Sequence, residues 1–177
     1  MKAAYWIDKL QMIKHPEGGY FKETYRSNEV LETRELPKRY ESERCFGTSI
    51  YFLLTIESVS NFHRLKSDEL WHFHQGGVAR IHFISPEGEY YHKDIGADFE
   101  KGETLQVIIP KNSWFAAEVI TGDFILVGCT VAPGFEFQDF ELADSMNCHI
   151  EVFGGIGSRW RDMKSIQLRG KNTFFLH

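Results

Sequence analysis

Four side chains that can bind a metal or move a proton lie within twelve residues: His63, Glu69, His72 and His74. The turn-forming residues 66–68 separate two apolar runs, so we expect two strands joined by a tight turn, with His63 and Glu69 facing one interior. Two-residue alternation sends His72 and His74 to the opposite face, and neither is predicted to be a metal ligand. A carboxylate beside an imidazole orients the ring and raises its basicity, so His63 and Glu69 are candidate acid-base residues.

The same pair also has a purely structural interpretation. Buried polar groups pair with each other, so His63 and Glu69 could simply hold the turn. We favour a functional pocket because pairs of titratable groups in aromatic-lined cavities are over-represented at binding and catalytic sites. In that case His63 is the predicted base, Glu69 its partner, and Tyr20 or Tyr25 the acid.

Eight further side chains are candidates for ligand binding. An arginine near a pocket would fix an anionic or sugar-like ligand, and aromatic rings would stack on it. The candidates are Arg26, Phe52, Trp71, Phe73, Gln106, Trp114, Phe115 and Glu118. The ordinary alternative is core packing for the aromatic residues and a solvent-facing strand position for the charged ones.

Hydrophobic periodicity predicts the elements that position these side chains. Residues 3–14 carry apolar side chains at spacings of three and four, which predicts a short helix, and 20–26 alternate as in a strand. Regularly spaced short apolar runs then indicate a β-sandwich or barrel. They lie at 46–56, 58–63, 69–75, 78–84, 89–94, 104–109, 114–120 and 123–131. The charged stretch 27–44 is predicted to be a mobile connection and a candidate lid.

The composition bounds the class of protein. With 177 residues, 42% hydrophobic and 25% charged, the chain is expected to form one folded domain over 1–177. A net charge of -5 without a basic stripe argues against nucleic acid. Cys45, Cys129 and Cys148 lack CxxC spacing, which indicates free thiols in a reducing compartment. Since no apolar run reaches 18 residues, we expect a cytoplasmic protein with no membrane partner.

Several sequence blocks resemble a known family. The spacing from His63 to Glu69 to Gly76 is similar to the first signature of the cupin superfamily, in which two histidines and a glutamate bind a metal. The chain more closely resembles a cupin subfamily defined as a domain of unknown function, over residues 5 to about 145. The matching blocks are His15-Pro16-Glu17-Gly18-Gly19-Tyr20-Phe21, Glu23-Thr24-Tyr25-Arg26-Ser27, Phe62-His63-Arg64-Leu65 through His74, Gly128-Cys129-Thr130-Val131-Ala132-Pro133-Gly134-Phe135 and Phe140-Glu141.

The chain departs from the metal-binding cupins at two ligand positions. The second histidine of the signature is replaced by Leu65, and the histidine of the second signature by Phe115. Neither side chain offers a lone pair, so His63 and Glu69 would remain as two protein ligands where a transition metal generally needs three or four. No cofactor is therefore expected, beyond a divalent metal held weakly by His63 and Glu69 with help from Gln106 or Glu118.

The resemblance implies an all-β double-stranded β-helix, the jelly-roll barrel of cupins, with a short N-terminal helix and assembly as a homodimer. The core is expected at about 16–145, and the tail 146–177 is unassigned. The predicted function is binding of a carbohydrate-like or polar-aromatic metabolite, with metal-independent isomerase or epimerase chemistry. Two alternatives stay open, a metal-dependent oxygenase or isomerase and a non-enzymatic sensor.

Overall fold

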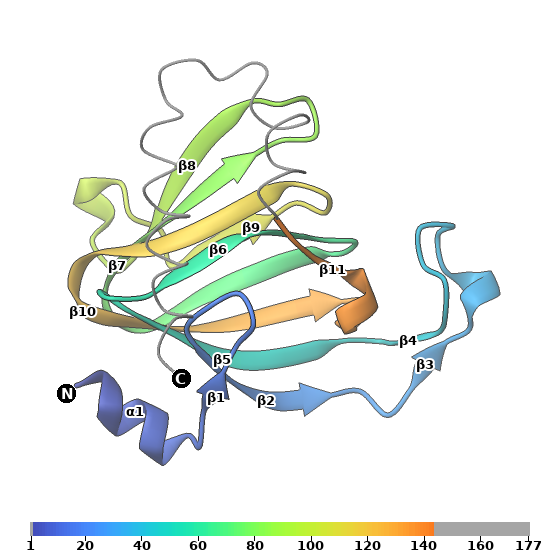
Figure 1. The fold of residues 1–177 in the computed structure, drawn as a ribbon, viewed down its shortest axis with the longest axis horizontal. Coiled ribbons are helices and arrows are strands. Elements are labelled where there is room, and N and C mark those ends of the chain that lie inside the picture. Colours follow the sequence, from blue (N-terminus) through green and yellow to red (C-terminus); the bar gives the residue numbers. More distant parts are fainter. Residues whose placement is uncertain (1, 144–177) are drawn as a thin grey trace.

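The protein is an antiparallel β-barrel with one short helix packed outside it (Figure 1). The computed structural model describes residues 2–143. The helical elements are α1 (Ala3–Lys9) and the 3-10 turns η1 (Thr33–Glu35), η2 (Phe99–Lys101) and η3 (Phe137–Asp139). The strands are β1 (Ile13–Lys14), β2 (Tyr20–Arg26), β3 (Val30–Leu31), β4 (Arg44–Cys45), β5 (Thr48–Thr55), β6 (Val59–Leu65), β7 (Asp68–Ile84), β8 (Tyr90–Ile95), β9 (Gln106–Ile109), β10 (Trp114–Ala132) and β11 (Phe140–Leu142).

Two long strands, β7 and β10, hold the barrel together. They pair with each other antiparallel along almost their whole length, and β10 also pairs with β5 and β6 while β7 also pairs with β8 and β9. Both strands curl round one end of the barrel (Figure 1), where the β7–β10 register shifts between Val119 and Ile125. The expected jelly-roll barrel is confirmed by this topology.

The bend in β7 depends on a pair of glycines. A Cβ at Gly76 would lie 2.3 Å from the carbonyl oxygen of Phe124, and one at Gly77 would lie 1.8 Å from that of Thr121. Any larger residue would therefore push β7 away from β10. The sequence predicted two strands at 69–75 and 78–84 and another two at 114–120 and 123–131, and both predictions of a break were wrong. The glycines bend a continuous strand instead of ending it.

Helix α1 covers part of the outer face of the sheet. Trp6, Ile7 and Leu10 pack against Leu53 and Leu126, which are buried below them. The predicted helix over 3–14 is confirmed only in its first half. It stops because Gln11 adopts a positive φ of 52°, after which β1 pairs with β2. Among the described residues, no helix is both long and apolar enough to cross a lipid bilayer.

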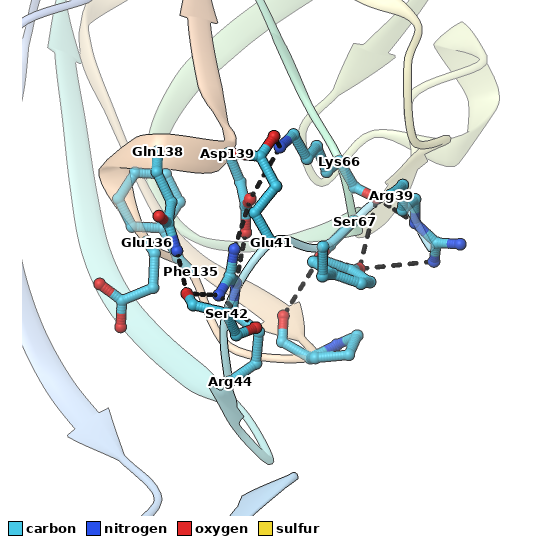
Figure 2. Close-up of polar contacts among 12 residues, drawn as sticks. Arg39, Glu41, Ser42, Arg44, Lys66, Ser67, Phe135, Glu136, Gln138 and Asp139 are labelled. Carbon is cyan, nitrogen blue, oxygen red and sulfur yellow. Dashed lines mark hydrogen bonds and ion pairs between the residues drawn. The ribbon is translucent and has the colours of Figure 1, made fainter. Parts of the chain in front are cut away.

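The stretch 27–44 is anchored by a buried ion pair rather than being a freely solvated connection. Arg44 donates from Nε and Nη2 to the two Asp139 carboxylate oxygens at 2.6 and 2.7 Å, and Nη1 donates to the Ser42 carbonyl at 2.8 Å (Figure 2). Tyr40 Oη lies 2.7 Å from Ser67 Oγ, which ties the same stretch to the turn between β6 and β7. The prediction of a mobile connection misses these contacts. Closure of the stretch over a ligand stays a prediction.

Candidate functional site

A cavity of about 100 Å³ lies inside one end of the barrel. Its walls come from the β1–β2 turn, from strands β2, β5, β6, β7 and β10, and from the segment around η3. The lining residues are His15, Glu17, Phe21, Glu23, Arg26, Thr48, Ile50, Phe52, His63, Leu65, Glu69, Trp71, Cys129, Val131, Phe135, Glu136, Phe137 and Phe140.

Strand register explains how these side chains meet. Trp71 of β7 pairs with Cys129 of β10, and Glu69 pairs with Val131 one step along the same face. On the other side of β10, Ile50 of β5 pairs with Cys129, and Thr48 of β5 pairs with Val131, which gives two rows of paired residues across the three strands. Since alternate residues of a strand share a face, these rows form one wall of the cavity.

The β1–β2 turn brings Glu17 into this space. Both the backbone N–H and the side-chain amide of Asn61 donate to the Glu17 carbonyl oxygen, at 2.8 and 2.7 Å. The next residue, Gly18, has φ +114°, and a Cβ there would lie 2.0 Å from the Val59 carbonyl oxygen. Gly18 therefore lets the turn lie directly against β6, which fixes the Glu17 side chain beside His63.

Glu17 forms the central ion pair of the cavity. Its Oε2 lies 3.1 Å from His63 Nε2 and 3.3 Å from His15 Nδ1, and Ser60 Oγ donates to Oε1 at 2.9 Å. Burial by itself would raise the pKa of Glu17, but His63, His15 and Ser60 together outweigh it and lower that pKa. Glu17 is therefore ionised at neutral pH.

Both ring nitrogens of His63 have a partner. Nδ1 lies 2.7 Å from the Asn61 carbonyl oxygen, an acceptor, so Nδ1 carries a proton. Nε2 faces the ionised Glu17 carboxylate, and that 3.1 Å contact needs a proton as well. Burial lowers the pKa of His63 below its ordinary value, and Glu17 and the Asn61 carbonyl offset only part of that effect. The 3.1 Å contact between Nε2 and Glu17 Oε2 is therefore a hydrogen bond that holds one proton between the two side chains.

Glu69 is in the opposite protonation state. Burial, and after it the negative charge of Glu17, raise the pKa of Glu69 to about 8, although Trp71 and Cys129 beside it partly offset the rise. Glu69 is therefore a neutral carboxylic acid at pH 7. The sequence predicted a His63–Glu69 pair. The structure brings both side chains into the cavity, but it pairs His63 with Glu17 instead.

Three of the predicted ligand-binding residues line the cavity: Phe52, Trp71 and Arg26. Arg26 lies at its mouth, where it is bound to Glu136 at 2.7 Å and to Glu23 at 2.9 Å. Its positive charge is therefore already matched by two carboxylates, and a ligand anion would have to displace one of them.

Seven predicted site residues do not line the cavity. Tyr20 packs on the helix side of the sheet, and the Tyr25 side chain is 55% exposed. The others are Phe73, Gln106, Trp114, Phe115 and Glu118. Alternation explains Tyr20, because Phe21 and Glu23 take the inward positions of β2. The register shift between Glu23 and Tyr25 then turns Tyr25 outward and Arg26 toward the cavity.

The remaining five have partners elsewhere. Phe115 lies behind the site, with its ring centroid 3.9 Å from that of His63, and Phe73 packs in the same core cluster. Trp114 belongs to a second core cluster. On the sheet surface, Gln106 lies 3.4 Å from His72, and Glu118 lies 3.4 Å from His82.

The cavity does not fit the metal that the cupin resemblance implies. His63 Nδ1 is bound to a carbonyl oxygen, so only Nε2 could ligate a metal, and Glu17 already pairs with it. Leu65 replaces another donor and lines the cavity as an apolar residue. Over residues 2–143, no group of three or more His, Cys, Asp or Glu side chains is arranged to hold a metal ion.

Sequence reasoning missed His15, Glu17 and the phenylalanines at 135, 137 and 140. Edge-to-face and stacked contacts join the His15 ring to Phe21, Phe52 and Phe137. The signal was present in the block that begins at His15, since it places a histidine and a glutamate two residues apart beside a pair of glycines. Only Tyr20 of that block is a predicted site residue.

Comparisons with known proteins agree with this architecture. Protein SO0799 from Shewanella oneidensis is 36% identical, with a TM-score of 0.78 over 96% of both chains. The uncharacterized protein YML079W from Saccharomyces cerevisiae is 33% identical over 144 residues, which are 75% of this chain and 71% of its own. Oxalate decarboxylase from Bacillus subtilis shares the fold alone, at 17% identity and a TM-score of 0.52 over 77% of this chain and 31% of its own.

A family model described as Cupin superfamily (DUF985) matches residues 4–143, which is nearly the whole described part. The chain therefore belongs to this family of the cupin superfamily.

Proposed function

We propose that this cupin binds a small polar-aromatic or carbohydrate-like metabolite and moves a proton on it without a metal, as an isomerase or epimerase does. The observation that carries the proposal is the pair of carboxyl groups in one cavity with opposite pKa shifts, Glu17 lowered and Glu69 raised to about 8. Titratable groups whose environments push their pKa values apart are the typical acid and base of a proton-transfer site.

The chemistry assigns one role to each group. The Glu17 carboxylate, held by His63, takes a proton from the carbon next to a substrate carbonyl. The electron pair of that C–H bond forms a C=C bond, and the π pair of the carbonyl moves to its oxygen, which accepts the Glu69 proton. In the epimerase reaction, water protonates the carbon on the opposite face, the enol proton returns to Glu69 as the carbonyl re-forms, and Glu17 gives its proton to water. In the isomerase reaction, Glu17 returns its proton to the neighbouring carbon, and the hydroxyl on the first carbon gives its proton to Glu69 as the new carbonyl forms. No electrons are gained or lost overall.

These roles differ from those expected from the sequence. His63, the predicted base, instead forms a hydrogen bond with Glu17. Glu69 takes the role of acid that was predicted for Tyr20 or Tyr25. Support comes from geometry, since neither tyrosine lines the cavity.

The test is proton exchange at carbon. The purified protein is incubated in D2O with a panel of aldoses, ketoses and small hydroxyketones, and loss of the C–H signal next to the carbonyl is followed by NMR. Exchange that disappears in both Glu17→Gln and Glu69→Gln supports the proposal. If no compound exchanges, and a small molecule that copurifies is recovered unaltered after incubation, a non-enzymatic sensor replaces it.

We also propose a homodimer and a cytoplasmic location. Strand β9 lies at a sheet edge, pairing with β7 alone in the described part, and its Ile108 and the preceding Leu105 are exposed, which supports burial against a second copy. Cys45 and Cys129 are free thiols, which supports a reducing compartment.

A further inference from the structure

Trp71 carries a buried hydrogen-bond donor that no atom of the described residues meets with full hydrogen-bond geometry. Its side chain is 1% exposed, and its indole Nε1 has no hydrogen-bond partner among the described residues. A buried donor left without a partner costs about 1–3 kcal/mol, so it requires an explanation. Because Trp71 lines the cavity, a ligand atom inside that cavity is a candidate partner.

The indole shares this part of the cavity with Glu69. The two residues lie two positions apart on β7, on the same face. The indole N–H acts as a weak donor that lowers the pKa of Glu69, although no contact of full hydrogen-bond geometry joins the two side chains. A neutral Glu69 offers an O–H donor in addition to the indole N–H. The Trp71 N–H and the Glu69 O–H can together donate to one oxygen that accepts two hydrogen bonds, as a carbonyl oxygen does.

The charges around the cavity disfavour a ligand that is an anion. Glu17 is a carboxylate inside the cavity, and Arg26 faces both Glu23 and Glu136, so the cavity and its mouth carry more negative than positive charge. Most of the remaining wall is apolar and aromatic. A carboxylate or phosphate would enter against this field, whereas an uncharged molecule would not.

The cavity also limits the size of the ligand. An engineered apolar cavity of about 150 Å³ holds benzene, so the space of about 100 Å³ here holds a somewhat smaller group. A larger ligand would have to extend past the mouth, where Phe137 is 57% exposed.

We propose that Trp71 Nε1–H and the Glu69 O–H together bind the carbonyl oxygen of a small uncharged aldehyde or ketone. This inference rests on the proposed function, because the same oxygen receives the Glu69 proton in the reaction. It also narrows the substrate class, since the negative charge at the mouth disfavours phosphorylated and carboxylated compounds. Trp71 is then a substrate-binding residue that stabilises the negative charge developing on the oxygen.

The test observes the Trp71 indole directly. The protein is labelled with 15N-tryptophan, and the Trp71 resonance is assigned among the four tryptophans by its absence in Trp71→Phe. Hydroxyacetone and cyclopentanone are titrated against propane-1,2-diol and cyclopentanol, which match them in size but lack the carbonyl. Pyruvate supplies a charged carbonyl for comparison.

We expect at least one uncharged carbonyl compound to move the Trp71 Nε1–H resonance, while its alcohol and pyruvate leave it in place. Trp71→Phe should then weaken binding of that compound by about 3- to 10-fold, the effect of losing one neutral hydrogen bond. If no carbonyl compound moves the resonance, or the alcohols move it equally, the inference fails.

Two variants separate this inference from the proposed function. Glu69→Gln keeps an N–H donor but has no acidic proton, so it should retain binding and lose exchange at carbon. Carbonyl binding with no exchange in the wild type would overturn the catalytic proposal alone. Exchange that persists undiminished in Trp71→Phe, with circular dichroism unchanged, would overturn the role of Trp71 alone.

Discussion

Glu17 Oε2 lies 3.1 Å from Nε2 of His63, the one ring nitrogen that could have faced a metal. A carboxylate from the β1–β2 turn thus pairs with His63 where metal-binding cupins use that histidine as a ligand. The apolar residues Leu65 and Phe115 stand at the two other histidine positions of the signatures. This end of the barrel carries one ionised and one neutral carboxyl group, Glu17 and Glu69.

A first prediction concerns metal content. Because His63 and Glu69 are two ligands at most and His63 is paired with Glu17, the purified protein should hold well under one iron, manganese or zinc per chain. Elemental analysis after dialysis measures this, with His63→Ala as the comparison. About one metal per chain that disappears in His63→Ala would instead favour the metal-dependent oxygenase or isomerase.

A second prediction follows from the raised pKa of Glu69. Between pH 4.5 and about 8 this carboxyl group is protonated in the folded protein and ionised in the unfolded chain, so the free energy of unfolding falls as pH rises through that window. Each unit of pKa shift corresponds to about 1.4 kcal/mol, so Glu69 removes roughly 3–4 kcal/mol between pH 5 and 8. Glu69→Gln cannot ionise and should lose that slope.

Urea unfolding at several pH values measures this difference. The wild type and Glu69→Gln share every other titrating group. The difference between their curves of unfolding free energy against pH is therefore due to Glu69. Parallel curves between pH 5 and 8 would mean that Glu69 is already ionised in the folded protein.

A third prediction concerns Arg44 and Asp139. Their side chains are 0% and 4% exposed, so removal of one partner leaves a buried charge, and Asp139→Asn should cost about 3–5 kcal/mol of unfolding free energy. Asp94→Asn, in the more exposed Arg80–Asp94 pair, should cost about 1 kcal/mol or less. Arg44→Met with Asp139→Leu should recover part of the loss. Equal effects of Asp139→Asn and Asp94→Asn would contradict this.

The ion pair also bears on the site. Asp139 ends η3, the turn that carries Phe137, and Phe140 follows it directly; both phenylalanines line the cavity. Arg44 therefore anchors one wall of the cavity from the stretch that the sequence suggested was mobile. The rise in melting temperature caused by the carbonyl compound that binds Trp71 should be smaller in Asp139→Asn than in Asp94→Asn.

Sequence periodicity was sufficient to predict the strands of the barrel and the inward direction of the His63 and Glu69 side chains. Alternation along a strand and a tight turn at 66–68 are local features, so they needed no knowledge of tertiary contacts. The Glu17–His63 pair was out of reach because it joins residues 46 positions apart through the packing of a turn on β6. Likewise, two consecutive glycines are typical of a turn, and only the pairing of β7 with β10 shows that the strand bends at Gly76 and Gly77 without ending.

A fourth prediction tests the glycine that positions Glu17. Gly18→Ala combines a positive φ with a Cβ 2.0 Å from the Val59 carbonyl oxygen, so it should cost about 2–4 kcal/mol of unfolding free energy. Gly88→Ala is the matched control, because Gly88 has φ +87° with no atom within 4 Å of the added Cβ. It should cost only about 1–2 kcal/mol. If the two variants unfold at the same urea concentration, the close approach of the turn to β6 is not required.

A fifth prediction concerns the pH dependence of exchange at carbon. Glu69 must be protonated to act as the acid, so the rate should fall about tenfold per pH unit above its pKa of about 8. Glu17 stays ionised to below its ordinary value of 4.5, so the rate should be nearly flat from pH 5 to 7.5. Loss of either group should reduce the rate by about 10²–10⁴-fold. A rate that rises with pH through 8 would mean that ionised Glu69 is the base, and the two carboxyl groups would then exchange roles.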